Sequence, residues 1–391
     1  MKLLQVTPYP AYPPLVGGAH RMHGLVSAKR DSDEVNRFAT APLGYTREHG
    51  GSRVEIEENY VEYRYEHIIN SVLGRVTGRG PNVYTSTLLR VLKPQQLVEW
   101  TNESDIILVE TPWLYKCIDQ LKYQETPIVF SSYDFTAELY SKLTRSTFGE
   151  RLYRKGIDAE RNAAKSADLI VTTSERDKQL YIDELGVDGP FHVAPSVTYR
   201  SNLNDIERTN GAVRSRHEIS ENALMSVFVG SKHWPNVTAV GAIAEMARSL
   251  GRSFQFVIIG KVCEEVDECE MPRNVHLLGY VDDLSEWYNA ADLALNPITQ
   301  GGGTNVKVIE YFSYELPVIT TPFGARGIPA NDGTHFIVAD IDSFSETIAE
   351  CREGKIDREA MSESARRLVD ERLNWERVSE ELLTKIRGLV A

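Results

Sequence analysis

A run of three glycines, Gly301 to Gly303, is the part of this sequence best suited to bind an anion. Glycine has no Cβ, so the backbone N–H groups of the run can approach a ligand closely. The run follows an apolar, strand-like segment, Asp292 to Asn296, and leads into a predicted helix. The first N–H groups of a helix lack intrahelical partners and lie at the positive end of its dipole. The sequence therefore predicts a phosphate-binding loop made of Gly301, Gly302, Gly303, Thr304 and Asn305.

Two charged residues follow the loop. Lys307 lies in the first turn of the predicted helix, and Glu310 comes three residues later on about the same face. A cation and a carboxylate placed in this way could hold a phosphate and a sugar hydroxyl. A flexible loop followed by an ordinary i,i+3 ion pair is the alternative. The strand-like segment Pro317 to Thr321 and the two glycines after it favour the binding loop.

Two other turns that follow predicted strands could contribute. Gly17 and Gly18 lie between the first predicted strand and a helix, at the edge where open α/β folds bind ligands, although a tight turn without a ligand would look the same. Lys232 follows another predicted strand. A second cation near one glycine loop suits a diphosphate, whereas a solvated lysine is the alternative. The sequence contains no dinucleotide fingerprint, P-loop or nucleophile elbow.

The acidic pairs and the cysteines do not point to a metal site. Asp282 and Asp283 are interpreted as a helix cap, and Asp31 and Asp33 precede a strand, at the wrong end of a sheet. The four cysteines show no C-x-x-C spacing, so free thiols are expected: Cys117, Cys263, Cys269 and Cys351. We expect no required metal.

The bulk composition is that of a globular protein with more than one domain. A chain of 391 residues fits two domains, and two domains imply a cleft. No apolar run approaches the length of a membrane span, and the first residues read as a strand with no secretory signal, so a cytoplasmic location is expected. The net charge of −13 disfavours non-specific binding to nucleic acid.

Short, continuous apolar segments alternate with helical patterns along the chain, which is typical of parallel strands covered on both faces. The pattern predicts an α/β protein with two doubly wound parallel-sheet domains. We place the domains at residues 1–198 and 199–373. The predicted strands are Leu3–Val6, Glu34–Ala39, Asp105–Val109, Ile128–Ser131, Leu169–Thr173 and Phe191–Ala194, then Ser226–Val229, Phe254–Ile259, Val275–Leu278, Leu293–Leu295, Val318–Thr320 and Phe336–Val338.

Two segments of the first half, 72–93 and 140–165, combine basic and apolar residues. Most basic helix faces are simply solvated. The alternative is that these segments dock on an anionic membrane or a lipid phosphate, which would place the protein at the inner membrane face.

Together these motifs resemble the GT-B glycosyltransferases of the large retaining family four, the glycosyl transferases of group 1. The resemblance covers essentially the whole chain. It is most specific in G-G-G-T-N-V-K-V-I-E at 301–310, and the G-S-x-x-W-P-N turn at 230–236 also matches. The resemblance implies two Rossmann-like domains facing across a cleft, with the acceptor in the first and the nucleotide-sugar donor in the second. It also implies that the last helix, within residues 374–391, crosses back to the first domain.

The resemblance implies roles for single residues. Glu310 resembles the second glutamate of the family's E-x7-E element, which holds the ribose hydroxyls. Lys307 and Lys232 would neutralise the donor diphosphate, and the backbone near Val281 would meet the base. The implied donor-binding residues are Gly17, Gly18, Lys232, Val281, Gly301, Gly302, Gly303, Thr304, Asn305, Lys307 and Glu310.

Two positions depart from the family pattern. Gly302 stands where the first glutamate of the E-x7-E element is expected, so contact with the sugar hydroxyls must come from backbone or elsewhere. Tyr133 and Asp134 stand where many members have a histidine in the first domain. Asp134 would orient the acceptor or the sugar, and a helix N-cap without a catalytic role is the alternative. The implied catalytic residues are Asp134, Tyr133, Lys307 and Glu310.

The implied activity is metal-independent transfer of a sugar, with retention, from a nucleotide-diphosphate sugar to a glycan or a lipid-linked saccharide. One alternative is a nucleotide-sugar epimerase, which uses the same donor without an acceptor. The other is a non-catalytic, nucleotide-binding paralogue that acts as a partner subunit.

Overall fold

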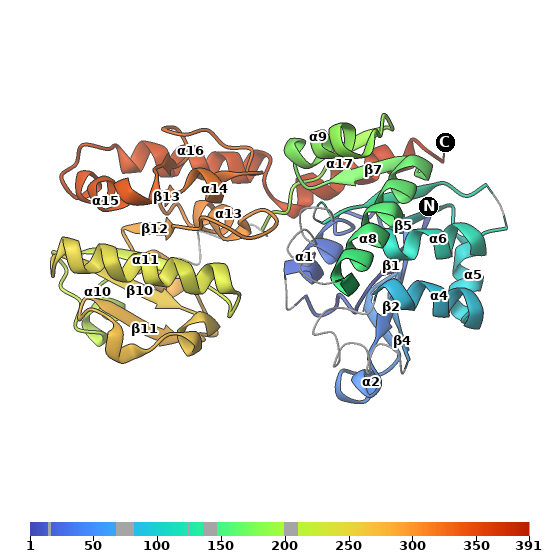
Figure 1. Ribbon diagram of the computed structural model, residues 1–391, viewed down its shortest axis with the longest axis horizontal. Helices are drawn as coiled ribbons and strands as arrows, with labels where there is room; N and C mark the ends of the chain where they lie inside the picture. The colour runs from blue at the N-terminus through green and yellow to red at the C-terminus, as the bar shows by residue number, and fades with distance from the viewer. Residues whose placement is uncertain are drawn as a thin grey trace. The chain divides into compact units, whose positions relative to one another are not determined.

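The computed structural model describes residues 1–14, 17–67, 82–123, 125–133, 135, 147–198 and 210–390. The chain divides into two compact units, one comprising Met1–Ser196 with Trp375–Ala391 and the other Val197–Asn374. Each unit has its own parallel sheet with helices packed around it (Figure 1). The expected α/β class with two parallel-sheet domains is confirmed.

The sheet of the first unit has eight strands in the order β3-β4-β2-β1-β5-β6-β7-β8. All neighbouring strands are parallel except β3, which is antiparallel to β4. The strands are β1 (Lys2–Thr7), β2 (Glu34–Ala41), β3 (Arg53–Glu57), β4 (Tyr60–Glu66), β5 (Ile106–Val109), β6 (Ile128–Ser131), β7 (Leu169–Thr172) and β8 (Phe191–Val193). The helices are α1 (Gly17–Gly24), α2 (Tyr45–Glu48), α4 (Asn82–Leu92), α5 (Gln95–Glu103), α6 (Pro112–Leu121), α8 (Thr147–Ser166), α9 (Glu175–Leu185) and α17 (Trp375–Arg387).

The second unit has six strands, all parallel, in the order β11-β10-β9-β12-β13-β14. The strands are β9 (Leu224–Val229), β10 (Phe254–Ile259), β11 (Val275–Gly279), β12 (Leu293–Asn296), β13 (Val318–Thr320) and β14 (Ile337–Val338). The helices are α10 (Asn210–Arg216), α11 (Trp234–Leu250), α12 (Ser285–Ala290), α13 (Val306–Ser313), α14 (Pro322–Ala325), α15 (Phe344–Arg352) and α16 (Arg358–Glu371), with the short 3-10 turns η3 (Lys261–Glu265), η4 (Glu268–Glu270) and η5 (Ile341–Ser343).

The twelve predicted strands are confirmed, because each observed strand starts and ends within two residues of the prediction. The Val, Ile and Leu runs of the central strands are buried on both faces and contribute to a separate core in each unit, whereas β8, β11 and β14 are only partly buried. The sequence pattern does not predict β3 and β4. In β4 the residues facing inward include Glu62 and Arg64, which are paired at 2.8 Å, and Arg37 of β2 pairs with Glu62 at 3.2 Å. A search for apolar runs cannot find a strand whose buried face is charged.

The last helix, α17, packs in the first unit, as the resemblance implies. Figure 1 shows it at the red end of the colour scale beside elements from the start of the chain. The buried ring of Trp375 lies against Gly24 of α1, and the Ser379 hydroxyl donates a hydrogen bond of 3.0 Å to the Leu25 carbonyl. Arg387 pairs with the buried Asp33 at 2.5 Å. These contacts explain why α17 belongs to the first unit.

Candidate functional site

In the second unit the direction of the strand connections reverses between β9 and β12. These two strands are neighbours, but the chain after β9 leads to β10 on one side and the chain after β12 leads to β13 on the other. Loops that leave in opposite directions open a crevice at the carboxyl ends of the strands, which is where open α/β sheets bind ligands. The predicted glycine loop follows β12, and the turn that holds Lys232 follows β9. The two segments singled out from the sequence therefore flank the crevice of this sheet.

The glycine loop adopts a backbone that suits anion binding. Gly301 and Gly303 have φ angles of +136° and +66°, which side chains other than glycine rarely adopt. A Cβ on Gly301 would lie 3.3 Å from Cγ of Pro235, so the loop packs closely against the first turn of α11. Among the described residues, the N–H groups from Gly301 to Asn305 donate no hydrogen bond to the protein. The loop thus offers a row of unused donors at the start of α13.

Lys307 lies in the first turn of α13, and its Nζ donates a hydrogen bond of 2.9 Å to Oδ1 of Asn236. The same nitrogen lies 4.2 Å from the ring centroid of Phe228, the penultimate residue of β9. Within the described part of the chain it pairs with no carboxylate. Burial disfavours the charged form and lowers the pKa of Lys307 to about 7, although the nearby Glu310 opposes the shift. An ammonium without a counter-ion in such surroundings attracts an anionic ligand.

Glu310 lies one turn further along α13. Burial raises the pKa of its carboxyl group, while the hydroxyl of Tyr288 and the ammonium of Lys307 lower it. Tyr288 is itself stacked edge-on against Tyr311 and Tyr314, with centroid distances of 5.5 and 4.9 Å. The carboxylate is therefore held beside an aromatic cluster, where it can accept hydrogen bonds from hydroxyl groups of a ligand.

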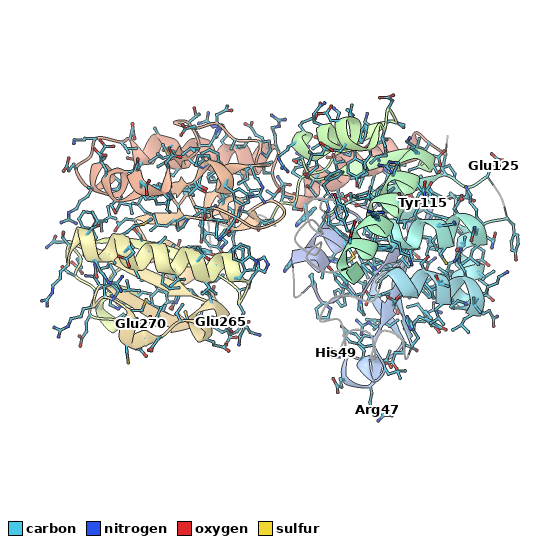
Figure 2. All side chains as sticks on the ribbon, viewed as in Figure 1. Arg47, His49, Tyr115, Glu125, Glu265 and Glu270 are labelled. Atoms are coloured by element: carbon cyan, nitrogen blue, oxygen red, sulfur yellow. The ribbon has the colours of Figure 1, made fainter. Side chains whose placement is uncertain are left out.

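Lys232 has a different environment. Its exposed ammonium lies 2.6 Å from Oε2 of Glu264 and 3.5 Å from Oε1 of Glu265, both on η3 (Glu265 is labelled in Figure 2). The hydrogen bond with Glu264 raises the pKa of Lys232. Lys232 can bind a phosphate only if the phosphate replaces these carboxylates or binds the ammonium together with them.

The turn after β11 holds Val281, the residue expected near the base. Val281 is partly buried, and its neighbour Tyr280 is 67% exposed. Asp283 accepts a hydrogen bond of 2.8 Å from the N–H of Ser285 at the start of α12. Asp283 thus contacts the first residue of α12, but the N-cap position itself is occupied by Leu284.

The first unit places Gly17 and Gly18 at the start of α1. A Cβ on Gly18 would overlap the Tyr9 hydroxyl, whereas one on Gly17 would meet open space. A side chain at Gly18 would have to displace the end of the Tyr9 side chain, whereas one at Gly17 would not. Asp134 lies outside the described residues.

Tyr133 follows β6, and its hydroxyl is buried with no hydrogen-bond partner in the described part of the chain. Burial and the nearby carboxyl group of Glu110 raise the pKa of Tyr133 well above its usual value. Glu110, directly after β5, and Ser131 at the end of β6 also carry buried oxygens without partners. Tyr133 therefore stays neutral and can act only as a hydrogen-bond donor or acceptor.

Four residues of these surroundings had no role predicted from the sequence: Phe228, Asn236, Tyr288 and Glu110. Asn236 was part of a recognised motif, but its contact with Lys307 joins residues 71 positions apart. Glu110 directly follows a buried strand, which is the one signal that could have indicated it. No group of three potential metal ligands occurs among the described residues.

One family model matches part of the second unit. The family model described as glycosyl transferases group 1 matches residues 224–353. No curated protein sequence matches the chain significantly.

Solved structures resemble the whole chain. Sucrose-phosphate synthase from Thermosynechococcus elongatus has 14% identity and a TM-score of 0.73, over 100% of this chain and 99% of that one. HepE from Anabaena in complex with UDP-glucose has 14% identity and a TM-score of 0.65, over 99% and 100%. An α,α-trehalose-phosphate synthase from Burkholderia xenovorans in complex with glucose-6-phosphate has 13% identity and a TM-score of 0.72, over 99% and 100%. At these identities the likeness establishes the fold.

Proposed function

We propose that this protein is a glycosyltransferase of the GT-B fold, which transfers a sugar from a nucleotide-diphosphate sugar to an acceptor with retention. The match of residues 224–353 to the glycosyl transferases group 1 model and the likeness to solved structures support the proposal. The observation that carries this proposal is the row of unused N–H donors from Gly301 to Asn305, with the ammonium of Lys307 one turn away. Diphosphate binding needs this combination of backbone donors and a cation. The similar structures determined with UDP-glucose and with glucose-6-phosphate support a UDP-sugar donor and a phosphorylated or larger sugar acceptor.

The proposed chemistry is displacement at the anomeric carbon with departure of a nucleoside diphosphate. Negative charge develops on the leaving phosphate, and preorganised donors in a site with little water can stabilise it by several kcal/mol. The glycine-loop amides and Lys307 would provide these donors, with Lys232 contributing after release from Glu264 and Glu265. Glu310 would accept hydrogen bonds from the ribose. With these donors in place we expect turnover in the presence of a chelator.

The first unit is proposed to hold the acceptor, a glycan or a lipid-linked saccharide. Tyr133 would contact it through its neutral hydroxyl, and the role of Asp134 stays a prediction. A membrane-bound acceptor is supported by exposed apolar residues at the end of α4, where Val91 is 74% exposed, and by Tyr123 after α6, which is 80% exposed. Arg90 of α4 and Gln120 of α6 are joined by a hydrogen bond of 3.2 Å, so the two helix ends are close. No helix in the described residues is long and apolar enough to span a bilayer.

A thermal-shift screen of nucleoside diphosphates and nucleotide sugars tests the donor. A ligand at 100 times its Kd stabilises the folded state by about 2.7 kcal/mol, which is readily measured. Binders are then incubated with a panel of sugars, sugar phosphates and lipid-linked saccharides. Transfer to an added acceptor supports the proposal. Turnover of the donor without an acceptor would indicate an epimerase, and binding without any turnover would indicate a non-catalytic paralogue.

We predict that Lys307→Ala and Glu310→Ala each reduce turnover at least about 100-fold, because each removes a group that stabilises the bound donor or its leaving phosphate. Steady-state kinetics with the donor found in the screen gives the measurement. Lys355→Ala is the matched control, since Lys355 is an exposed lysine of the same unit that pairs with Glu353. Near-native rates in both site variants would rule out this assignment of the site.

A further inference from the structure

Asn236 connects the two loops that flank the crevice of the second unit. Its Nδ2 donates hydrogen bonds of 3.1 and 3.2 Å to the carbonyl and the hydroxyl of Ser231, which fixes the turn after β9. Its Oδ1 accepts the hydrogen bond from Lys307, which lies beyond the glycine loop. The orientation of the amide group is thus set on one side by the turn, so that its oxygen faces the lysine on the other.

The two groups that hold the ammonium of Lys307, the amide of Asn236 and the ring of Phe228, are both neutral. An amide oxygen at 2.9 Å and an aromatic face at 4.2 Å hold the ammonium in one place, since each attracts a cation without carrying a net charge. A carboxylate at the position of the amide would hold the lysine equally well but would neutralise it. Lys232 in the same unit shows that arrangement, because two glutamates surround its ammonium.

We propose that Asn236 is the positioning residue of the anion site: it fixes the ammonium of Lys307 over the ring of Phe228 and leaves its charge available for a diphosphate. This inference rests on the proposed function, since the diphosphate is that of the donor. According to this inference, a neutral side chain outside the glycine loop contributes to the selectivity of the site for anions. The remaining N–H donors of the ammonium are then free to bind phosphate oxygens.

The test compares variants that separate position from charge. Asn236→Asp keeps an oxygen beside Lys307 and adds a negative charge, so we expect binding of UDP and of inorganic pyrophosphate to weaken at least about tenfold. Asn236→Ala and Phe228→Leu release the ammonium without adding charge, and we expect several-fold weaker binding. Asn222→Asp is the matched control, because it changes the net charge equally but lies before the first residue of β9, at the opposite edge of the sheet. Circular dichroism and thermal unfolding verify that each variant is folded.

Lys307→Met completes the set and separates two kinds of failure. If it weakens binding but Asn236→Asp binds as well as the wild type, the positioning role is refuted and the donor site stands. If Lys307→Met itself binds pyrophosphate and UDP as the wild type does, the proposed donor site fails, and the inference fails with it. A folded Asn236→Asp protein with unchanged melting temperature and weakened binding would exclude a purely structural role for Asn236.

Discussion

Lys307 is the residue whose chemistry depends most on its surroundings. On a solvated helix it would be an ordinary cation, but here burial lowers its pKa to about 7, although the nearby Glu310 opposes the shift. A fraction of the protein is therefore uncharged at this position near neutral pH. A bound diphosphate supplies the missing negative charge and favours the protonated form. Donor binding and protonation of Lys307 are expected to be coupled.

This coupling gives a prediction that can be measured by calorimetry. When UDP binds at pH 8, where its phosphates are already ionised, the pKa of Lys307 should rise and the protein should take up protons. Glu310 is the charged neighbour that raises the pKa of Lys307. Titrations in two buffers with different ionisation enthalpies give the number of protons. Proton uptake by the wild type but not by Lys307→Met is expected, and equal heats in both buffers would contradict it. Because UDP binds the protonated form of Lys307 more tightly, affinity for UDP should fall as the pH rises above about 7.

At the scale of elements, the candidate functional residues of both units lie at the carboxyl ends of β-strands. The loops after β9 and β12 carry the proposed anion site, and Glu110 and Tyr133 lie just after β5 and β6. Helix α13 contributes Lys307 from its first turn, while α17 packs on α1 in the first unit. The contact between α1 and α17 depends on a glycine, since a Cβ on Gly24 of α1 would overlap the ring of Trp375 of α17.

We predict that Gly24→Ala destabilises the protein by about 1–3 kcal/mol, because an added methyl group must displace a fully packed indole ring. Gly17→Ala in the same helix is the matched control. A Cβ there meets no atom within 4 Å, and alanine favours a helix over glycine, so its free energy of unfolding should change by less than about 0.5 kcal/mol. Chemical denaturation measures both. Equal stability of the two variants would show that the packing of α17 on α1 tolerates the extra volume.

The whole molecule consists of two units with separate cores. Its net charge and its local basic regions have opposite effects on binding to an anionic surface. The net charge of −13 repels anionic surfaces in general. The ends of α4 and α6 nevertheless combine exposed apolar side chains with basic ones, and α8 adds exposed arginine and lysine. The two segments predicted from the sequence to meet a membrane, 72–93 and 140–165, lie partly outside the described residues. Their described parts include α4 and nearly all of α8.

If this surface docks on a membrane, binding to liposomes should increase with the fraction of anionic lipid and decrease with salt. The double substitution Val91→Ser and Leu92→Ser should weaken binding several-fold, because it removes exposed apolar area. Leu43→Ser is the control, since Leu43 is an exposed leucine of the same unit in a different segment. Cosedimentation provides the measurement, and binding that ignores lipid charge and salt would reject the proposal.

The sequence by itself determined the class of fold and the position of the glycine loop. Both can be predicted from local patterns. Continuous apolar runs indicate strands that are buried on both faces. Glycines between a strand and a helix indicate a loop that needs unusual backbone angles. The hairpin of β3 and β4 was missed because its buried face carries Glu62 and Arg64, whose burial depends on Arg37 from another strand. Local hydropathy cannot represent a charge that is neutralised by a distant residue.

Only the tertiary structure decided which cations are available to a ligand. Lys232 and Lys307 look equivalent in the sequence, yet the first is paired with Glu264 and Glu265 and the second is held by Asn236 and Phe228. The difference arises because folding brings η3 to one lysine and the end of β9 to the other. The charge that a lysine presents is set by what surrounds it in space, and for Lys307 those neighbours lie more than 70 positions away in the chain.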